Sequence, residues 1–463
     1  MNIKSILEEI PDYEYFLSVD ELDRNSRQLA EEFPENVKLL EIGSSRSGHP
    51  ILCLKIGHEP QNALVFGCPH PNEPIGAMML EFFSQKLASD PQLLSELGFT
   101  WYIIKCVDPD GTKLNEGWFR GPFTPYNYAR NFFRPASHQQ VEWTFPISYK
   151  TLKFSNPIPE TKALMSIIDA VKPDFMYSLH NAGFGGAYWY ISDAARDPWL
   201  YETFHKLARQ NNVPLSLGEP EMPYAQKFGE AVYRLPSTKD TYDYYEKFTD
   251  EDPGKMISGG TSSIDYLKLN NENAFGLVCE VPYFYDARIE DTTLSDMIRK
   301  DAVLNACEIR LEVYNFAKME MEKIENYLSP ENPFKVTLDD FLSTGPKSVD
   351  AEKRWAETSK ECQRLATIAE KFDNLQVTRF YSMLTLGLLF RCAEYELECC
   401  QKKYSPAVIR ALEDVRNNAI VKLDQCNVAL MDDLNYSVIP IKRLISVQLG
   451  SGLAVAEYVK LQK

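Results

Sequence analysis

Up to about residue 325, the chain alternates short apolar runs with longer amphipathic stretches. The apolar runs are rich in aromatic and β-branched residues, as is typical of buried strands: 62–68, 100–107, 175–180, 188–192 and 276–281. The stretches between them, such as IGAMMLEFFSQKLAS and PETKALMSIIDAVK, carry apolar residues at helical spacing. Strands that alternate with helices predict an α/β fold, in which helices flank a mixed, largely parallel sheet.

The pattern changes after residues 328–348, a segment rich in Pro, Ser and Gly that we interpret as a linker. From there on, apolar residues recur at three- and four-residue steps, which predicts an all-α helical bundle. We therefore expect two domains, 1–327 and 349–463, as the length of 463 residues also suggests. The bundle has no cluster of candidate catalytic residues. Its role stays open between packing, shaping access to the first domain, and contact in a homo-oligomer.

Composition and charge narrow the classes of partner. The formal net charge is −17, so nucleic acids and anionic membranes would be repelled, and we expect neither as a partner. The first residues, MNIKSILEEIPDYEYF, lack the apolar core of an export signal, and no run reaches the roughly 18 apolar residues that cross a bilayer. We therefore expect a cytoplasmic protein whose ten cysteines are reduced thiols.

A His-x-x-Glu pair, His70 and Glu73, lies between a predicted strand and a predicted helix. The pair alone is a weak signal, because six histidines and many glutamates would produce such a spacing by chance. A third candidate, His180, ends the predicted strand 175–180. A catalytic zinc ion takes three nitrogen or oxygen ligands and leaves a fourth position for water. Because ligands of α/β proteins gather at the carboxyl ends of strands, this placement favours a metal site over unrelated polar residues.

Glu280 is embedded in the apolar run GLVCEVP. A buried carboxylate without a partner is costly, so we expect either a metal site or an ion pair to satisfy it. Metal-dependent hydrolysis also needs a carboxylate that takes the proton of the attacking water. Glu280 is our candidate for that base.

Six stretches of the chain resemble, in order, the motifs of zinc carboxypeptidases of the funnelin type and their deacylase relatives. They are EIGSSRSGHPILCLKIG, GCPHPNEPIG, VDPDG, NYARNF, KPDFMYSLHN and SGGTSSIDYLKLNNENAFGLVCEVP. The resemblance covers roughly residues 5–320. It implies one Zn²⁺ per chain, held by His70, Glu73 and His180. It also implies that Glu280 carries the proton of water to the leaving amine.

The resemblance further implies the residues that would bind the substrate. Arg120 would polarise the scissile carbonyl and stabilise the oxyanion. Arg130 would bind the terminal carboxylate through two parallel hydrogen bonds. The family's motif usually reads Asp-x-Asn-Arg, and Ala129 takes the place of its Asn. Recognition of the carboxylate is then either looser or shared by Asn131 and Arg134.

The tyrosine that closes over the substrate in peptide-cleaving members has no counterpart at its usual position. We expect Tyr242, Tyr244 or Tyr245, in the acidic segment 237–255, to supply this phenol from a mobile loop. A solvated acidic loop without a role is the alternative. Ile264, in the matched Ser-Ile-Asp, implies a pocket for an apolar or aromatic C-terminal side chain. The acidity of the loop would favour basic substrates instead, and we give preference to Ile264 because its signal is positional.

Three functions from different classes fit these residues. The first is a zinc metallocarboxypeptidase that acts on peptides, and the second is a zinc deacylase or amidase that acts on N-acyl amino acids. The third is a non-catalytic interaction protein that works through its helical domain. Retention of three metal ligands together with Glu280 favours an enzyme, and we predict the carboxypeptidase.

Overall fold

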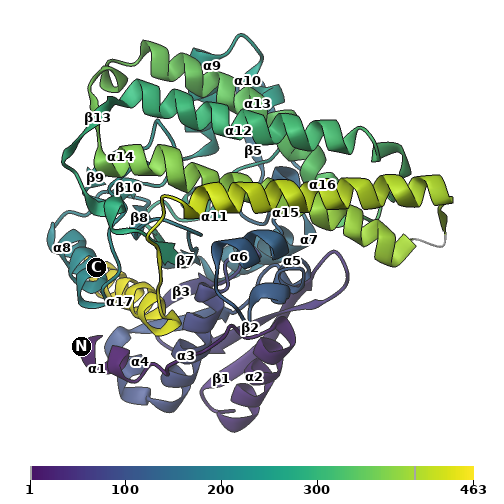
Figure 1. Cartoon of the computed structure of the whole chain (residues 1–463). Coiled ribbons are helices and arrows are strands. Elements are labelled where there is room, and N and C mark those ends of the chain that lie inside the picture. Colours follow the sequence, from purple (N-terminus) through teal and green to yellow (C-terminus); the bar gives the residue numbers. More distant parts are fainter. Residues whose placement is uncertain (1–2, 401–402, 463) are drawn as a thin grey trace.

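A nine-stranded sheet forms the centre of the molecule, in a computed structural model that describes residues 3–400 and 403–462 (Figure 1). The strand order is β1-β2-β4-β3-β7-β11-β8-β10-β9. The neighbours β4, β3, β7 and β11 run parallel, as do β8 and β10, whereas the other four pairs are antiparallel. The predicted mixed sheet with a parallel centre is confirmed. The strands are β1 (Val37–Ser44), β2 (Pro50–Ile56), β3 (Gln61–Phe66), β4 (Phe99–Ile104), β7 (Phe175–Leu179), β8 (Tyr188–Ile191), β9 (Lys227–Gly229), β10 (Val232–Arg234) and β11 (Phe275–Glu280).

Helices cover both faces of this sheet. The helices α3 (Ile75–Ser89), α8 (Trp199–Gln210) and α17 (Ile441–Leu461) lie on one face, and α7 (Pro159–Val171) and α11 (Ser263–Asn270) lie on the other. Every residue of β7 and β11 is buried as a result. This explains why these strands appear in the sequence as continuous apolar runs rather than as an alternation of apolar and polar residues.

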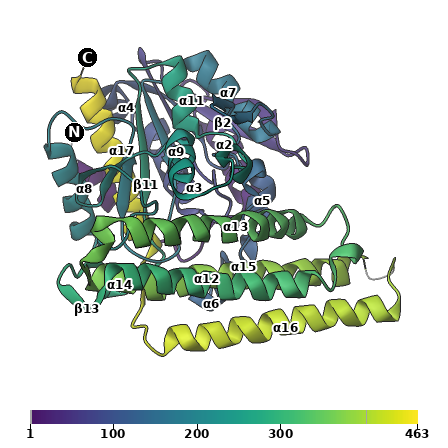
Figure 2. The ribbon, with the colours of Figure 1, turned by 90° about the horizontal axis from the view of Figure 1, so that it is seen from above.

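A layer of long helices lies beside the sheet and is seen edge-on in Figure 2. It contains α12 (Arg299–Met321), α13 (Pro333–Thr358), α15 (Thr378–Tyr395) and α16 (Pro406–Met431), and its helices contact one another extensively. The predicted helical C-terminal region is confirmed. Its last helix, α17, leaves this layer and packs on the sheet, so the C-terminal residues contribute to both parts of the molecule. The division into two domains as such stays a prediction.

The expected linker, 328–348, is mostly helical, and we correct that expectation. Residues from 333 onward belong to α13, which continues through Pro346. A Cβ atom on Gly345 would lie 2.6 Å from the ring of Tyr314 in α12, so this glycine allows close helix packing. Burial of one face of α13 against its neighbours stabilises the helix despite its low intrinsic propensity.

The remaining elements are short, apart from α2. The helices are α1 (Ile3–Glu8), α2 (Val19–Glu32), α4 (Pro91–Leu97), α5 (Pro109–Lys113), α6 (Pro125–Asn131), α9 (Thr238–Phe248), α10 (Pro253–Met256) and α14 (Ile368–Phe372). Three two-stranded pairs are formed by β5 (Ile147–Tyr149) with β6 (Leu152–Phe154), β12 (Phe284–Tyr285) with β15 (Ser437–Val438), and β13 (Leu294–Ile298) with β14 (Leu365–Thr367).

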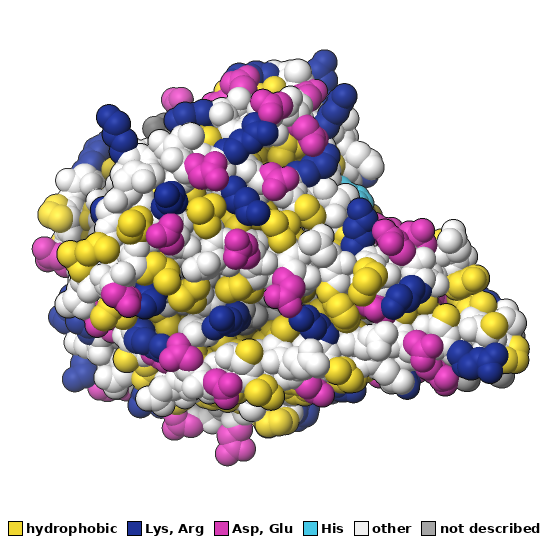
Figure 3. Space-filling view, turned by 45° about the horizontal axis from the view of Figure 1, so that its top comes forward, with side chains coloured by type: hydrophobic (Ala, Val, Ile, Leu, Met, Phe, Trp, Pro, Cys, Tyr) yellow, Lys and Arg dark blue, Asp and Glu magenta, His cyan; other side chains and the backbone are white. Residues whose placement is uncertain are grey.

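Charges of both signs are interspersed over the face shown in Figure 3. The cysteines whose side chains the structure describes are free thiols, and Cys400 lies outside that set. Among the described residues, no helix combines the length and the apolar composition needed to span a membrane. The cytoplasmic location stays a prediction.

Candidate metal centre and active site

Three neighbouring parallel strands, β3, β7 and β11, end at the same edge of the sheet. The loop after β3 carries His70 and Glu73, His180 directly follows β7, and Glu280 is the last residue of β11. The loop after β3 starts close to the neighbouring strand end, because a Cβ atom on Gly67 would lie 2.7 Å from the backbone oxygen of Lys105. Parallel strands bring their carboxyl ends together, so these four side chains converge.

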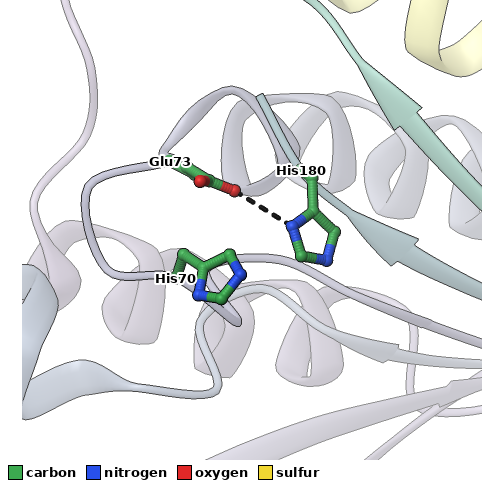
Figure 4. A group of neighbouring side chains, drawn as sticks. All are labelled: His70, Glu73 and His180. Carbon is green, nitrogen blue, oxygen red and sulfur yellow. Dashed lines mark ion pairs between the residues drawn. The ribbon is translucent and has the colours of Figure 1, made fainter. Parts of the chain in front are cut away.

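His70, Glu73 and His180 form a buried cluster, which we call the His-Glu-His cluster. One potential ligand atom from each residue lies within 4.8 Å of the others. Figure 4 shows the three side chains pointing toward one another, with Glu73 Oε2 at 3.2 Å from His180 Nδ1. Imidazole nitrogens and a carboxylate oxygen form a donor set that suits zinc.

One nitrogen of each histidine faces the cluster. His70 Nδ1 is buried and has no hydrogen-bond partner within residues 3–400 and 403–462. On His180, Nε2 lies 2.9 Å from the hydroxyl of Ser178, and Nδ1 is turned toward Glu73. A buried polar atom without a partner is unfavourable, and a metal ion would satisfy it. The residues present therefore fit a zinc ion.

The pKa values of the two histidines shift in opposite directions. Burial lowers the pKa of His70, and the positive charge of Arg134 acts in the same direction. Burial would also lower the pKa of His180, but hydrogen bonds with Glu142 and Glu73 outweigh it and raise that pKa to about 10. Without metal, His180 thus carries a proton at neutral pH, and a metal ion would displace it.

Glu280 lies beside the cluster. Its Oε1 is 3.7 Å from Nδ1 of His180. Burial raises the pKa of Glu280 well above its ordinary value, and repulsion by Glu73 adds to this effect. A carboxylate that readily takes up a proton is suited to act as a general base.

A cavity of about 850 Å³ opens at these residues. The strand ends of the sheet form one wall, and residues of α9, α12, α13 and α15 form the opposite wall. His70, Glu73, His180 and Glu280 all line this cavity. A substrate in the cavity would therefore contact both the sheet and the layer of long helices.

Comparison with known proteins shows to which family this chain belongs. The family model of the zinc carboxypeptidases matches residues 23–270, more than half of the chain. The chain belongs to the zinc carboxypeptidase family. The matched region includes His70, Glu73 and His180, whereas Glu280 and the long C-terminal helices follow it.

Several solved structures resemble this zinc carboxypeptidase family member at low sequence identity. The carboxypeptidase A of Helicoverpa armigera is 14% identical and has a TM-score of 0.36, over 77% of this chain and 79% of its own. A metallo-carboxypeptidase of Burkholderia cenocepacia is 15% identical with a TM-score of 0.34, over 59% and 61%. Bovine thrombin-activatable fibrinolysis inhibitor is 14% identical with a TM-score of 0.31, over 74% and 98%. No curated protein matches the sequence.

Glu142 is a site residue of this family member that sequence reasoning missed. It is buried, and its Oε1 accepts hydrogen bonds from the hydroxyls of Ser178, at 2.6 Å, and Ser263, at 3.0 Å. The same oxygen lies 3.5 Å from Nε2 of His180. Such a carboxylate orients a ligating histidine. No local spacing connects Glu142 to the other site residues, so only the fold reveals its position.

Arg120, which we expected at the oxyanion, lies elsewhere. Its side chain is 61% exposed, donates to Glu21 at 3.0 Å and stands over the ring of Tyr15. Trp118, two residues earlier, is buried against aromatic side chains and anchors this segment, so that Arg120 faces solvent. The expectation for Arg120 is therefore corrected.

Arg130 and Asn131, expected to bind the substrate carboxylate, belong to a helix interface instead. The guanidinium of Arg130 lies 4.7 Å from the ring centroid of Phe390 in α15, and the amide of Asn131 donates back within α6. A Cβ atom on Gly387 would lie 1.8 Å from the carbonyl oxygen of Ala129. This part of α6 is thus in direct contact with α15, and neither Arg130 nor Asn131 lines the cavity.

Arg134 is the arginine of this region that reaches the cluster. Its Nε donates to Asn72 Oδ1 at 3.1 Å, and its Nη2 donates to Glu73 Oε1. It lies three residues past the end of α6 and lines the cavity. From the sequence, we considered Arg134 only as a residue that could share recognition of the substrate carboxylate with Asn131.

The three candidate tyrosines lie in α9, a helix that Ser237 begins with a capping box, rather than in a loop. Tyr244 and Tyr245 line the cavity, whereas the hydroxyl of Tyr242 is bonded to Thr151. Ile264 is buried in the core against Gly276 and does not line the cavity. The expected mobile loop and the expected pocket floor are therefore both corrected.

Proposed function

We propose that the protein is a zinc-dependent metallocarboxypeptidase that hydrolyses the C-terminal peptide bond of a peptide. The observation that carries this proposal is the buried His-Glu-His cluster, with its unpartnered His70 nitrogen, beside a second buried carboxylate, Glu280. Membership of the zinc carboxypeptidase family supports the same chemistry.

In this mechanism, His70, Glu73 and His180 would hold the zinc ion. A bound zinc ion supplies a Lewis acid that polarises a carbonyl and lowers the pKa of water. Glu280 takes the proton of the attacking water on a carboxylate oxygen and delivers it to the nitrogen of the leaving amine. We assign to Arg134, the cation nearest Glu73, the stabilisation of negative charge on a substrate oxygen.

One observation favours testing a second function, hydrolysis of N-acyl amino acids. Neither Arg120, expected at the oxyanion, nor Arg130, expected at the terminal carboxylate, lines the cavity, so two contacts of the expected peptide-binding mode are not at the site. A deacylase would use the same cluster and the same base on a smaller substrate.

A substrate panel tests the proposal. The zinc-loaded protein is incubated with blocked dipeptides, longer peptides and N-acyl amino acids, and the products are read by mass spectrometry. We expect loss of single C-terminal residues from peptides. Glu280→Gln should abolish this activity while one zinc ion per chain is retained, and the exposed Glu35→Gln should have no effect.

Two outcomes contradict the proposal. Cleavage of N-acyl amino acids alone favours the deacylase. Stoichiometric zinc without hydrolysis of any of these substrates favours a non-catalytic protein.

A further inference from the structure

Four hydroxyl side chains share one face of α15. They stand at positions i, i+3, i+4 and i+7 of an otherwise largely apolar and buried helix: Thr378, Tyr381, Ser382 and Thr385. All four line the cavity that contains the His-Glu-His cluster. This helix lies outside the residues that the family model matches.

Ser382 has a hydroxyl that the fold itself does not use. The residue is only 7% exposed, and its hydroxyl has no hydrogen-bond partner among the described residues. A serine inside a helix commonly bonds to the carbonyl four residues earlier, which would have satisfied it at no loss of packing. Leaving a buried hydroxyl unpaired costs about 1–3 kcal/mol. The hydroxyl is therefore unsatisfied within the described part of the fold, at a residue that lines the cavity.

Tyr381 connects this face to the metal site. Its hydroxyl oxygen accepts the N–H of Gly183 at 3.0 Å, and Gly183 lies three residues after His180. The residue is 41% exposed although most of α15 is buried, and it lines the cavity. The bond holds the phenol beside the loop that follows a predicted metal ligand, and its O–H remains a donor.

Contacts with α6 fix the position of α15 without any substrate. The backbone contact between Gly387 and Ala129 brings α15 against α6, and Arg391 donates to the carbonyl oxygen of Asn131 at 2.7 Å. Figure 2 shows α15 within the layer of long helices beside the sheet. The hydroxyl face is thus a preformed wall of the cavity.

We propose that this hydroxyl face binds the peptide main chain of the substrate. Hydroxyls both donate and accept hydrogen bonds, as do the N–H and C=O groups of amides, and the four side chains carry no charge. From Thr378 to Thr385 the helix rises by about 10 Å, the length of roughly three residues of extended peptide. The inference rests on the proposed peptidase function, and it gives the C-terminal helices a part in substrate binding.

The variants Ser382→Ala and Thr385→Val test this inference, because they remove a hydroxyl and change little of the shape. The full-length, zinc-loaded protein is assayed with a blocked dipeptide and with a blocked pentapeptide that has the same C-terminal pair. Loss of one uncharged hydrogen bond corresponds to a decrease in kcat/KM of about 2- to 10-fold. We expect this decrease for the pentapeptide, mainly through KM, and a change below about twofold for the dipeptide.

Thermal unfolding gives a second readout. Ser382→Ala should leave the unfolding midpoint unchanged or raise it, because it removes an unpaired buried hydroxyl. The matched control is Ser26→Ala in α2, a buried serine outside the cavity whose hydroxyl donates to Leu22 O at 2.7 Å. It should leave both substrates' kcat/KM unchanged.

Each contrary outcome has a distinct meaning. Unchanged pentapeptide kinetics in both variants overturn the inference and leave the proposed function standing. An equal loss on both substrates, or a lower unfolding midpoint for Ser382→Ala, makes the hydroxyls structural and also overturns it. Failure of the unmodified protein to hydrolyse any peptide overturns the inference together with the proposed function.

Discussion

The side-chain amide of Gln448 donates a hydrogen bond to the backbone carbonyl of His180 at 2.6 Å. The same amide nitrogen lies 3.3 Å from the carbonyl oxygen of Cys279, the residue before Glu280. One buried amide of α17 therefore links the end of β7 to the end of β11. Although Gln448 is 268 positions from His180 in the chain, it helps to set the distance between a predicted metal ligand and the predicted base.

Replacement of Gln448 by Leu should loosen the site. Both hydrogen bonds are lost, and we expect a stability decrease of about 1–3 kcal/mol and a 10- to 100-fold weaker affinity for zinc. Urea unfolding and competition with a chelator measure the two effects. The control is Ser446→Ala, also in α17, whose hydroxyl bonds only within the helix. Unchanged zinc affinity and kcat in Gln448→Leu would show that the link has no role in the site.

Glu142→Gln should weaken zinc binding without disturbing the fold. The amide keeps the shape of the carboxylate but removes the charge that holds His180, so we expect affinity to fall by about 10- to 100-fold. Glu160→Gln is the matched control, because Glu160 is equally buried but bonds to Arg46 outside the cavity. Equal zinc affinities of the two variants would contradict a role for Glu142 in orienting His180.

Zinc binding should release a proton at pH 8. His180 has a pKa raised to about 10 in the metal-free protein, and it must lose its proton before Nδ1 can bind metal. Affinity should therefore rise about tenfold per pH unit between pH 7 and 9, and fall further in acid. Calorimetry in buffers of different ionisation enthalpy measures the released proton. A binding heat that is independent of the buffer would refute this prediction.

Asp108→Asn should stabilise the protein, and more so at high pH. Burial raises the pKa of Asp108 to about 7 from an ordinary value of 3.8, and Oδ2 has no partner among the described residues. The folded state therefore binds this proton more tightly than the unfolded state, and stability is lost as pH rises from about 4 through 7. The full penalty corresponds to at most roughly 4 kcal/mol.

Urea unfolding of the unmodified protein and Asp108→Asn at pH 4.5 and pH 8 measures this difference. We expect a larger gain in the free energy of unfolding at pH 8 than at pH 4.5. The amide can still accept the N–H of Gly111, so the start of α5 is preserved. An equal gain at both pH values would mean that Asp108 is not protonated preferentially in the folded state.

The metal-site candidates could be predicted because each belongs to a local pattern. His70, Glu73 and His180 follow apolar strands, and a parallel sheet brings such positions together whatever the details of packing. The choice among the arginines could not be predicted in this way. Arg130 and Arg134 are four residues apart, and only the contact of α6 with α15 decides which of them reaches the cluster.

Residues that act through tertiary contacts left no signal in the sequence. Glu142 and Gln448 lie in segments without metal-binding spacing, yet both contact His180 in the fold. Composition also gave a wrong prediction for residues 328–348, where residues such as Gly345 and Pro346 suggested a linker. In the structure this segment is mostly helical, and Gly345 lets α13 pack closely against Tyr314 of α12.

X-ray diffraction from crystals of the zinc-loaded protein, recorded on both sides of the zinc absorption edge, shows most directly whether the His-Glu-His cluster binds zinc. We expect one anomalous peak per chain, located between a ring nitrogen of His70, Nδ1 of His180 and the carboxylate of Glu73. The peak should disappear in His70→Ala. A zinc peak at any other place, or none at this cluster in fully loaded protein, would contradict this expectation.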